Sequence, residues 1–321
     1  MIIPIFIPHE GCPNDCAFCN QRTISGKESL PSIADAEKII NDHLETMNGF
    51  AEQIAFFGGS FTGIDIDLQN QYLSLAKKYI DKKCVGSIRL STRPDYIDNE
   101  TVKRLISYGV KNIELGAQSM SDDVLFASNR GHNALQVEKA SEIINKNGVV
   151  LGLQMMTGLV LDTDEKSMMT AKKFIGLGAN ETRIYPTIVL KNTLLESFYN
   201  DGRYTPQTVE EAVDICAKLY ECFEKNGVKV LRIGLPDSVS LKENYVAGPY
   251  HPSFGELVIS RRIRNEIEKL SQGKKEVSVT ANKRYISRII GNKRSNVAYF
   301  KNKGITLVVK EDENTDSYTV K

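Results

Sequence analysis

The 321-residue sequence lacks tryptophan and lacks any run of apolar residues long enough to cross a membrane. A transmembrane helix needs about 18 or more such residues, so we expect no contact with a membrane. The first residues, MIIPIFIPHEGCP, also lack the basic leader and the small-residue cleavage site of a signal peptide. We therefore expect a globular, cytoplasmic protein, with enough residues for one large α/β domain and an appendage or for two ordinary domains.

The chain as a whole has almost no net charge, but its charges are distributed unevenly along the sequence. The formal net charge is +1, whereas residues 261–303 hold thirteen Lys and Arg against three Glu, a balance of about +10. The basic residues of this segment are Arg261, Arg262, Arg264, Lys269, Lys274, Lys275, Lys283, Arg284, Arg288, Lys293, Arg294, Lys301 and Lys303. Such asymmetry suggests a polyanionic partner, and a well-charged solvated surface is the alternative.

Cysteine is also scarce, with six residues, yet the stretch GCPNDCAFCN places Cys12, Cys16 and Cys19 within eight positions. In a reducing cytosol, clustered cysteines mark a metal or redox site more often than a disulfide framework. The other three, at positions 84, 216 and 222, are scattered, and we expect them to be structural.

The number three has a chemical consequence. A 4Fe-4S cluster has four irons to ligate, so three thiolates leave one iron open to a substrate or cosubstrate. Two alternatives remain at this point. His9 precedes Cys12 by three residues, so the same stretch would also supply a Cys3His zinc site with all positions filled. An incidental cluster is the second alternative.

Apolar, β-rich segments alternate with amphipathic helical segments, which predicts six βα units and a parallel sheet. The expected strands are 2–8, 53–59, 87–94, 110–119, 149–158 and 181–189, and the expected helices are 33–48, 67–83, 99–108, 133–147, 164–177 and 206–226. Ser32 and Asp98 are candidate N-caps, and Gly109, Gly148 and Gly227 follow helix ends. The pattern suits an open doubly wound sheet or a barrel.

Two of the expected strands carry polar residues on one face, which favours the barrel. The alternation of a strand groups Arg89 with Ser91 and Arg93, and it groups Glu114 with Gly116 and Gln118. Polar side chains on a buried strand are costly unless that face lines a polar cavity. A barrel with its site at the carboxyl ends of the strands provides such a cavity.

The pattern changes after about residue 227. VKVLRIGLP, residues 228–236, predicts one more strand, and the stretch from 254 to 271 predicts a helix with a basic face. The remaining residues mix strand-like runs with turns. We expect residues 1–236 to form the main domain and residues 237–321 to form a small basic α+β extension.

The cysteine motif resembles a known signature. CxxxCxxC in the loop after the first strand, with Phe18 before the last cysteine, is similar to the motif of the radical S-adenosylmethionine (SAM) enzymes. The resemblance implies a partial (β/α)6 barrel, a 4Fe-4S cluster on Cys12, Cys16 and Cys19, and SAM bound to the open iron beside Phe18. It also implies an electron donor of the flavodoxin or ferredoxin type and a 5′-deoxyadenosyl radical that abstracts hydrogen from a substrate.

The stretch FFGGSFTG, residues 56–63, resembles the family's glycine motif after the second strand. The resemblance implies that Gly58, Gly59 and Ser60 hold the amino group of SAM, because only glycine permits so close a backbone approach. Ser60 stands where an acidic residue is more common, so this sequence departs from the usual pattern there.

Further matches follow at later strand ends. GAQS and NRGH resemble the coproporphyrinogen-oxidase-like and Elongator-like branches, which implies that Gln118 and Arg130 contact SAM, Arg130 through its carboxylate. In the same way, the resemblance of STRPD implies that Thr92 and Arg93 contact the ribose of SAM, and that of MMTGL implies that Gly158 lies near the adenine.

The stretch 183–206, RIYPTIVLKNTLLESFYNDGRYTP, resembles the segment after the sixth strand in the catalytic subunit of Elongator and its bacterial relatives. That subunit modifies the wobble uridine of transfer RNA, so the resemblance implies RNA modification with tRNA as a partner. We find no acetyltransferase domain, and the compact cysteine spacing also departs from the subunit. A small-molecule radical enzyme of the coproporphyrinogen-oxidase-like group and a zinc-stabilised RNA-binding protein remain as alternatives.

Overall fold

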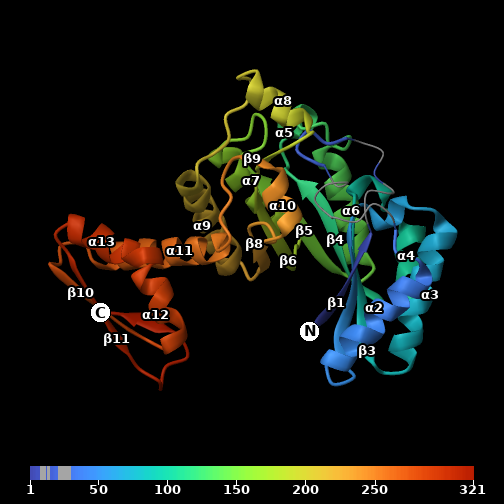
Figure 1. Cartoon of the computed structure of the whole chain (residues 1–321), viewed down its shortest axis with the longest axis horizontal. Coiled ribbons are helices and arrows are strands. Elements are labelled where there is room, and N and C mark those ends of the chain that lie inside the picture. Colours follow the sequence, from blue (N-terminus) through green and yellow to red (C-terminus); the bar gives the residue numbers. More distant parts are fainter. Residues whose placement is uncertain (8–11, 13–14, 21–29) are drawn as a thin grey trace.

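The computed structural model describes residues 1–7, 12, 15–20 and 30–321. Its main body is a curled sheet of seven parallel strands in chain order (Figure 1). The strands are β1 (Ile2–Ile7), β2 (Ala51–Gly58), β3 (Val85–Thr92), β4 (Val110–Gln118), β5 (Val150–Thr157), β6 (Glu181–Pro186) and β8 (Lys229–Ile233). Since β1 and β8 form the two edges, the sheet is an open half-barrel. The predicted partial barrel is confirmed, with the strand expected after residue 227 as its last member.

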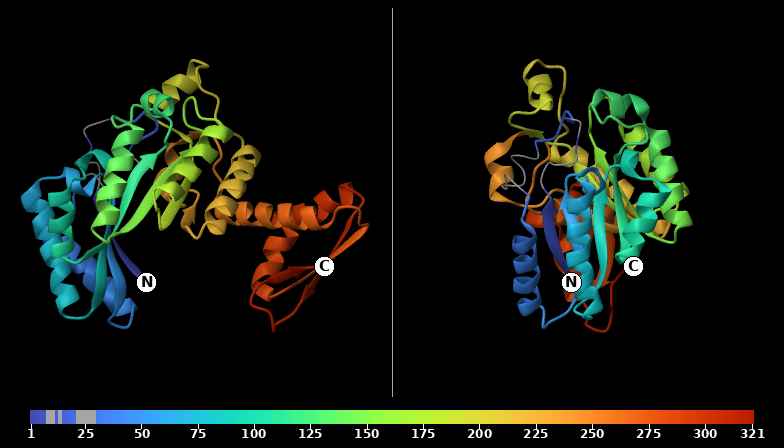
Figure 2. Two further views of the ribbon diagram at one scale, coloured as in Figure 1. Left: turned by 180° about the vertical axis from the view of Figure 1, so that it is seen from behind. Right: turned by 90° about the vertical axis from the view of Figure 1, so that its right-hand side faces the viewer.

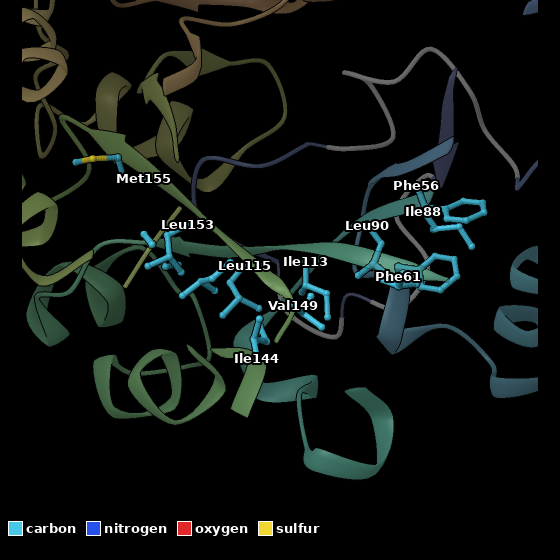
Figure 3. Packing of buried hydrophobic residues seen from close by; sticks show 14 of the residues in the cluster. Phe56, Phe61, Ile88, Leu90, Ile113, Leu115, Ile144, Val149, Leu153 and Met155 are labelled. Atoms are coloured by element: carbon cyan, nitrogen blue, oxygen red, sulfur yellow. The ribbon is translucent and has the colours of Figure 1, made fainter. Parts of the chain in front are cut away.

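Six helices cover the outer face of the sheet. They are α2 (Ile33–Thr46), α3 (Ile66–Asp81), α4 (Asn99–Ser107), α6 (Ala134–Lys146), α7 (Asp164–Gly176) and α9 (Val209–Lys225). Ser32 and Asp98 cap α2 and α4 as predicted, each accepting a backbone N–H in the first turn. The core lies between these helices and the sheet, where Phe56 stacks on Phe61 with ring centroids 4.8 Å apart (Figure 3).

Short elements near the carboxyl ends of the strands were not predicted. They are α5 (Asp122–Ala127), α8 (Leu194–Asn200), α10 (Val239–Asn244) and the antiparallel pair β7 (Val189–Leu190) with β9 (Tyr245–Ala247). In Figure 1, α5 and α8 lie at the top, above the strands. The chain therefore returns after β8 to build part of the barrel mouth.

The C-terminal part forms a separate small unit, as Figure 2 shows. Helix α11 (Phe254–Leu270) packs against α9 and leads to β10 (Glu276–Ala281), α12 (Lys283–Ile290), α13 (Ser295–Asn302), β11 (Thr306–Glu311) and β12 (Tyr318–Val320). In this three-stranded sheet, β10 is central, parallel to β11 and antiparallel to β12. Ile263, Val279 and Phe300 belong to its own apolar core. The predicted α+β fold of the extension is confirmed, whereas the domain boundary after residue 236 stays a prediction, since α10 and β9 lie at the barrel mouth.

No helix in the described part of the chain is both long enough and apolar enough to cross a bilayer.

Candidate active site

A cavity of about 290 Å³ opens at the carboxyl ends of the strands. The cysteine loop supplies Cys12, Phe18 and Cys19 to its wall. The strand ends and their following turns supply Phe6, Gly58, Gly59, Ser91, Thr92, Arg93, Gly116, Gln118, Gln154 and Met156, and Arg130 completes this polar side. Seven of the nine residues predicted to bind SAM thus surround one space, although they come from segments far apart in the sequence.

The cysteine loop is fixed from two sides by backbone contacts. The Ala17 N–H donates to the Ser128 carbonyl at 2.9 Å, just after α5, and the Leu195 N–H of α8 donates to the Ala17 carbonyl at 2.7 Å. Asn129 Nδ2 also donates to the Asp15 carbonyl at 2.8 Å. The unpredicted helices α5 and α8 therefore position the loop at the mouth of the barrel.

Two guanidinium groups lie beside the thiols. Arg130 Nη1 donates to Cys16 Sγ at 3.1 Å, and Arg93 Nη2 donates to the Arg130 carbonyl at 2.8 Å. Burial raises the pKa of the Cys12 thiol and the nearby Cys16 adds to this, while Arg93 and Arg130 act in the opposite direction. The two guanidinium groups thus offset only part of the effect of burial, and the pKa of Cys12 stays above its ordinary value.

The glycine turn after β2 makes a close backbone contact. Gly58 has a φ of 115°, and a Cβ atom there would lie 2.4 Å from the Ile7 carbonyl oxygen. The Gly59 N–H donates to the same oxygen at 2.7 Å. Only glycine fits at position 58, because the neighbouring strand end lies so close. Contact of this turn with the amino group of SAM stays a prediction.

Gln118 shows an unmet hydrogen-bonding capacity at the cavity. The residue is buried, with a φ of 68°, and within the described part of the chain its Oε1 atom has no hydrogen-bond partner. A buried polar atom without a partner is costly, and a bound ligand with donor groups would satisfy it. The polar side of the cavity thus fits a cosubstrate such as SAM.

Two of the nine predicted residues lie outside this cavity. Ser60 is fully buried beneath it, where its hydroxyl pairs with Thr92 Oγ1 at 2.9 Å and accepts from the Arg93 N–H at 3.2 Å. Gly158 lies in a neighbouring hollow, where its carbonyl accepts from the Tyr204 hydroxyl at 2.6 Å. Direct contacts of these two with SAM stay predictions.

The side chains of Cys12, Cys16 and Cys19 have the right chemistry to ligate an iron–sulfur cluster. Cys12 and Cys19 face the cavity, and Cys16 is buried next to Arg130. Among residues 12, 15–20 and 30–321, no three Cys, His, Asp or Glu side chains already converge as a metal site. The ligand roles of the three cysteines therefore stay predictions.

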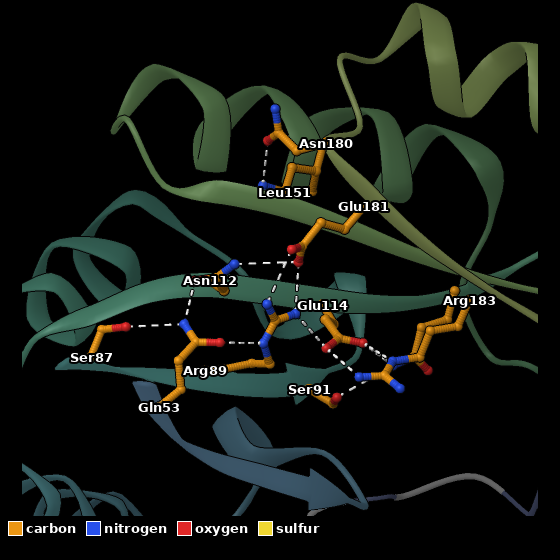
Figure 4. Close-up of polar contacts among 11 residues, drawn as sticks. Gln53, Ser87, Arg89, Ser91, Asn112, Glu114, Leu151, Asn180, Glu181 and Arg183 are labelled. Atoms are coloured by element: carbon orange, nitrogen blue, oxygen red, sulfur yellow. Dashed lines mark hydrogen bonds and ion pairs between the residues drawn. The ribbon is translucent and has the colours of Figure 1, made fainter. Parts of the chain in front are cut away.

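A buried ionic network lies on the inner face of the sheet (Figure 4). Arg89 Nη1 donates to Glu114 at 2.8 Å and to Glu181 at 2.7 Å. Arg183 Nε donates to Glu114 at 2.6 Å, and Gln154 Nε2 donates to it at 3.0 Å. Burial alone would raise the pKa of Glu114, but the hydrogen bonds from Arg183 and Arg89 hold it below its usual range. The polar strand faces predicted from sequence thus form a neutral network, which touches the cavity through Gln154.

The rest of the cavity lining, called the far wall below, is mostly apolar and was not predicted. It consists of Tyr185, Pro186, Ile188, Leu190, Leu235, Pro236, Ser238 and Leu241. Burial raises the pKa of the Tyr185 hydroxyl. The only sequence signal was the tyrosine-proline turn after the sixth strand.

His132, the last residue of NRGH, is buried behind the cavity. One ring nitrogen, Nε2, lies 3.2 Å from the Ala117 carbonyl oxygen. Burial, together with the charge of Arg130, lowers the pKa of His132 to about 3. The ring is therefore neutral at physiological pH and supports the strand end that carries Gln118.

Comparison with known proteins identifies matching families. A model of the radical SAM superfamily matches residues 6–174, and a model of the radical SAM C-terminal domain matches residues 179–265. The first match alone spans more than half of the chain.

Several curated relatives share these regions. Elongator complex protein 3 of Saccharomyces cerevisiae is 30% identical over 261 residues, covering 66% of this chain and 46% of the relative. The tRNA uridine(34) acetyltransferase of Dehalococcoides mccartyi is 31% identical over 127 residues, covering 39% and 28%. An uncharacterized protein of Methanocaldococcus jannaschii is 31% identical over 214 residues, covering 63% and 65%. The chain thus matches less than two thirds of the length of each relative.

Solved structures share the fold. The archaeal Elp3 of Methanocaldococcus infernus superimposes with a TM-score of 0.67 at 19% identity, covering 84% of this chain and 63% of the other. Coproporphyrinogen III oxidase from Escherichia coli gives 0.52 at 14% identity, covering 70% and 53%.

Proposed function

The chain belongs to the radical SAM superfamily, and we propose that it modifies transfer RNA by radical chemistry. The superfamily's cofactors are a 4Fe-4S cluster and SAM, as the cysteine motif predicted. One observation carries the proposal: Cys12 and Cys19 share a single cavity with the predicted SAM-binding residues. When bound, the cluster and SAM would together supply the radical chemistry that removes hydrogen from the substrate.

The residues of this chain have separable tasks in the proposal. Cys12, Cys16 and Cys19 would hold the cluster. Gly58 and Gly59 would hold the amino group of SAM, and Arg130 would pair with its carboxylate while it keeps the cysteine loop against the end of β4. The mostly apolar far wall would keep water away from the reacting carbon.

Transfer RNA is favoured as the substrate by the relatives. Two of those compared are named as a tRNA uridine(34) acetyltransferase and as Elongator complex protein 3. The reaction takes place in the cytoplasm and draws its electron from a flavodoxin or ferredoxin.

A small-molecule substrate is the second candidate, favoured by the apolar far wall. Ile188, Leu190 and Leu241 there would pack against an apolar substrate more readily than against a charged nucleotide. The two candidates differ in whether RNA is changed by the enzyme.

Nucleoside analysis tests the proposal. We expect a modified nucleoside of bulk tRNA to disappear when the gene is deleted and to return with the wild-type gene but not with Cys16→Ala. Anaerobically reconstituted protein should contain about four irons per chain, and Cys16→Ala should lose them. An unchanged nucleoside profile would exclude tRNA in favour of the small-molecule candidate, and zinc in place of iron would refute the radical chemistry.

A further inference from the structure

The basic C-terminal segment is less positive than its composition suggests. Five of its thirteen basic residues form ion pairs with carboxylates of α9 or α11, namely Arg261, Arg262, Lys269, Arg288 and Lys303. Arg264 lies over the Tyr299 ring at 4.1 Å. The charge of α11 is thus largely neutralised locally, so the formal balance of about +10 overstates the free positive charge of this segment.

Lys293 and Arg294 differ from these paired residues. Both lie in the turn between α12 and α13, both are exposed, and in the described part of the chain no carboxylate lies within 4 Å of either. Their φ angles are 49° and 61°, in the left-handed region that costs a non-glycine residue about 1 kcal/mol or more. The fold therefore holds two adjacent cations in a strained conformation with no partner of its own.

Buried contacts fix the turn. Gly291, with a φ of 82°, begins it, and the Arg294 N–H donates to the Gly291 carbonyl at 2.9 Å. Asn296 is 3% exposed, and its Nδ2 donates to the Ile289 carbonyl and to Ser260 Oγ of α11, both at 3.0 Å. The turn is thus anchored to the helix that joins the unit to the barrel.

An apolar strip adjoins the turn. Ile286 and Ile290 lie four residues apart, on one face of α12, and Val297 lies in the first turn of α13. All three are half-buried, and none belongs to the described core of the C-terminal unit. Unpaired cations beside an apolar strip match the two parts of a single-stranded nucleic acid, its phosphates and its exposed bases.

We propose that this surface, made of residues 291–294 with Ile286, Ile290 and Val297, binds a single-stranded segment of RNA by its sugar–phosphate backbone. A glycine-containing turn between two helices is one way in which RNA-binding domains hold backbone nucleotides. Arg294 occupies the fourth position of this turn and keeps the left-handed conformation. A duplex is the poorer ligand, because its bases are stacked inside and cannot reach the apolar strip.

The position of the C-terminal unit sets a minimum length for the bound RNA. Figures 1 and 2 show the C-terminal sheet beside the barrel and away from its mouth. An RNA held at the turn must therefore extend along the molecule to reach the cavity. The inference rests on the proposed function for the choice of tRNA, which has both single-stranded ends or loops and sufficient length.

Charge reversal in the full-length protein tests the inference. The variant is Lys293→Glu/Arg294→Glu, and the matched control is Lys274→Glu/Lys275→Glu, which reverses an exposed basic pair before β10. The probes are unmodified tRNA and a 12-nucleotide oligouridine, compared with an RNA duplex by fluorescence anisotropy at several salt concentrations. We expect the variant to bind the tRNA and the oligouridine at least tenfold more weakly and to lower the log–log salt slope by about 0.7 for each lost phosphate contact, while the control changes less than threefold.

Equal losses in the two variants, or a wild-type preference for duplex, would overturn the inference, because both indicate nonspecific attraction. Lys293→Asn/Arg294→Asn removes the charge with residues that tolerate the left-handed conformation, so its binding loss should match that of the Glu variant if the fold is intact. Wild-type protein that binds no RNA would also overturn it. Nucleoside analysis decides the proposed function separately in each case.

Discussion

Arg130 joins the cysteine loop to the sheet, since its Nη1 atom donates to Cys16 Sγ at 3.1 Å and its Nη2 atom to the Gly116 carbonyl at 2.6 Å. We expect Arg130→Ala to weaken SAM binding by one to two orders of magnitude, because a charged hydrogen bond contributes about 1.5 to 3 kcal/mol. Equilibrium dialysis with reconstituted protein measures this. Arg130→Lys keeps the positive charge but lacks the planar guanidinium group, so its affinity for SAM should lie between those of the wild type and Arg130→Ala. Wild-type affinity in Arg130→Ala would contradict the role given to Arg130.

Substitution of Gln118 should affect the stability of the protein and its binding of SAM in different ways. Gln118→Met keeps the length of the side chain but removes the buried Oε1 atom, which has no partner in the described structure. The free energy of unfolding without cofactor should stay equal or rise, because an unsatisfied acceptor is lost. SAM binding should weaken about tenfold, or about 1.4 kcal/mol. Loss of stability with unchanged binding would assign Gln118 a structural role instead.

Local signals explain why the barrel was predictable. Alternating apolar patterns, caps such as Ser32 and glycines after helix ends act over a few residues, so the order of strands and helices follows from the sequence. The polar strand faces also pointed to an inner cavity. The cysteine motif was equally local.

The features that were not predicted depend on contacts between segments that are far apart in the sequence. Arg130 meets Cys16 across 114 positions, and β7 meets β9 only after the chain has formed α8, α9, β8 and α10. The charge count of the C-terminal segment misled for the same reason, because Glu210 and Asp214 of α9 neutralise Arg261 from outside that segment. Short elements such as α8 offer too few residues for a periodic signal.

The ionic network predicts a large stability effect at Glu114, whose side chain is 1% exposed. Glu114→Gln leaves Arg89 and Arg183 buried with incomplete compensation, so the free energy of unfolding should fall by about 3 to 5 kcal/mol. Glu256→Gln is the matched control, because Glu256 pairs with Arg288 at the surface and should cost about 1 kcal/mol or less. Urea denaturation measures both. Similar losses would show that burial of the network has little energetic effect.

His132 predicts a dependence of stability on pH. Its pKa is lowered from 6.5 to about 3 in the folded state, so the unfolded chain binds a proton more readily. The stabilising contribution is therefore complete above pH 6.5 and is lost as the pH falls toward 3. Between pH 7 and pH 5, we expect a loss of about 2 kcal/mol from this group, at about 1.4 kcal/mol for each pH unit below 6.5. His132→Gln should show a flatter profile in urea denaturation over that range, and an unchanged slope would refute the assignment.

Gly58 and Gly49 make it possible to measure separately the cost of a strained backbone and the cost of a steric clash. Both have positive φ angles, 115° and 80°, but a Cβ at Gly58 would lie 2.4 Å from the Ile7 carbonyl, whereas nothing lies within 4 Å at Gly49 among the described atoms. Gly49→Ala should therefore cost about 1 kcal/mol from the left-handed backbone alone. Gly58→Ala should cost several times more, because the end of β1 must shift.

The same pair also tests whether the glycine turn serves the cluster. Strand β1 ends at Ile7, five residues before Cys12, so a shift of that strand end displaces the loop that carries the thiols. Iron content after anaerobic reconstitution should fall in Gly58→Ala and stay at the wild-type level in Gly49→Ala. Full iron retention in a destabilised Gly58→Ala variant would mean that the loop is positioned by α5 and α8 alone, through the contacts of Ala17 with Ser128 and Leu195.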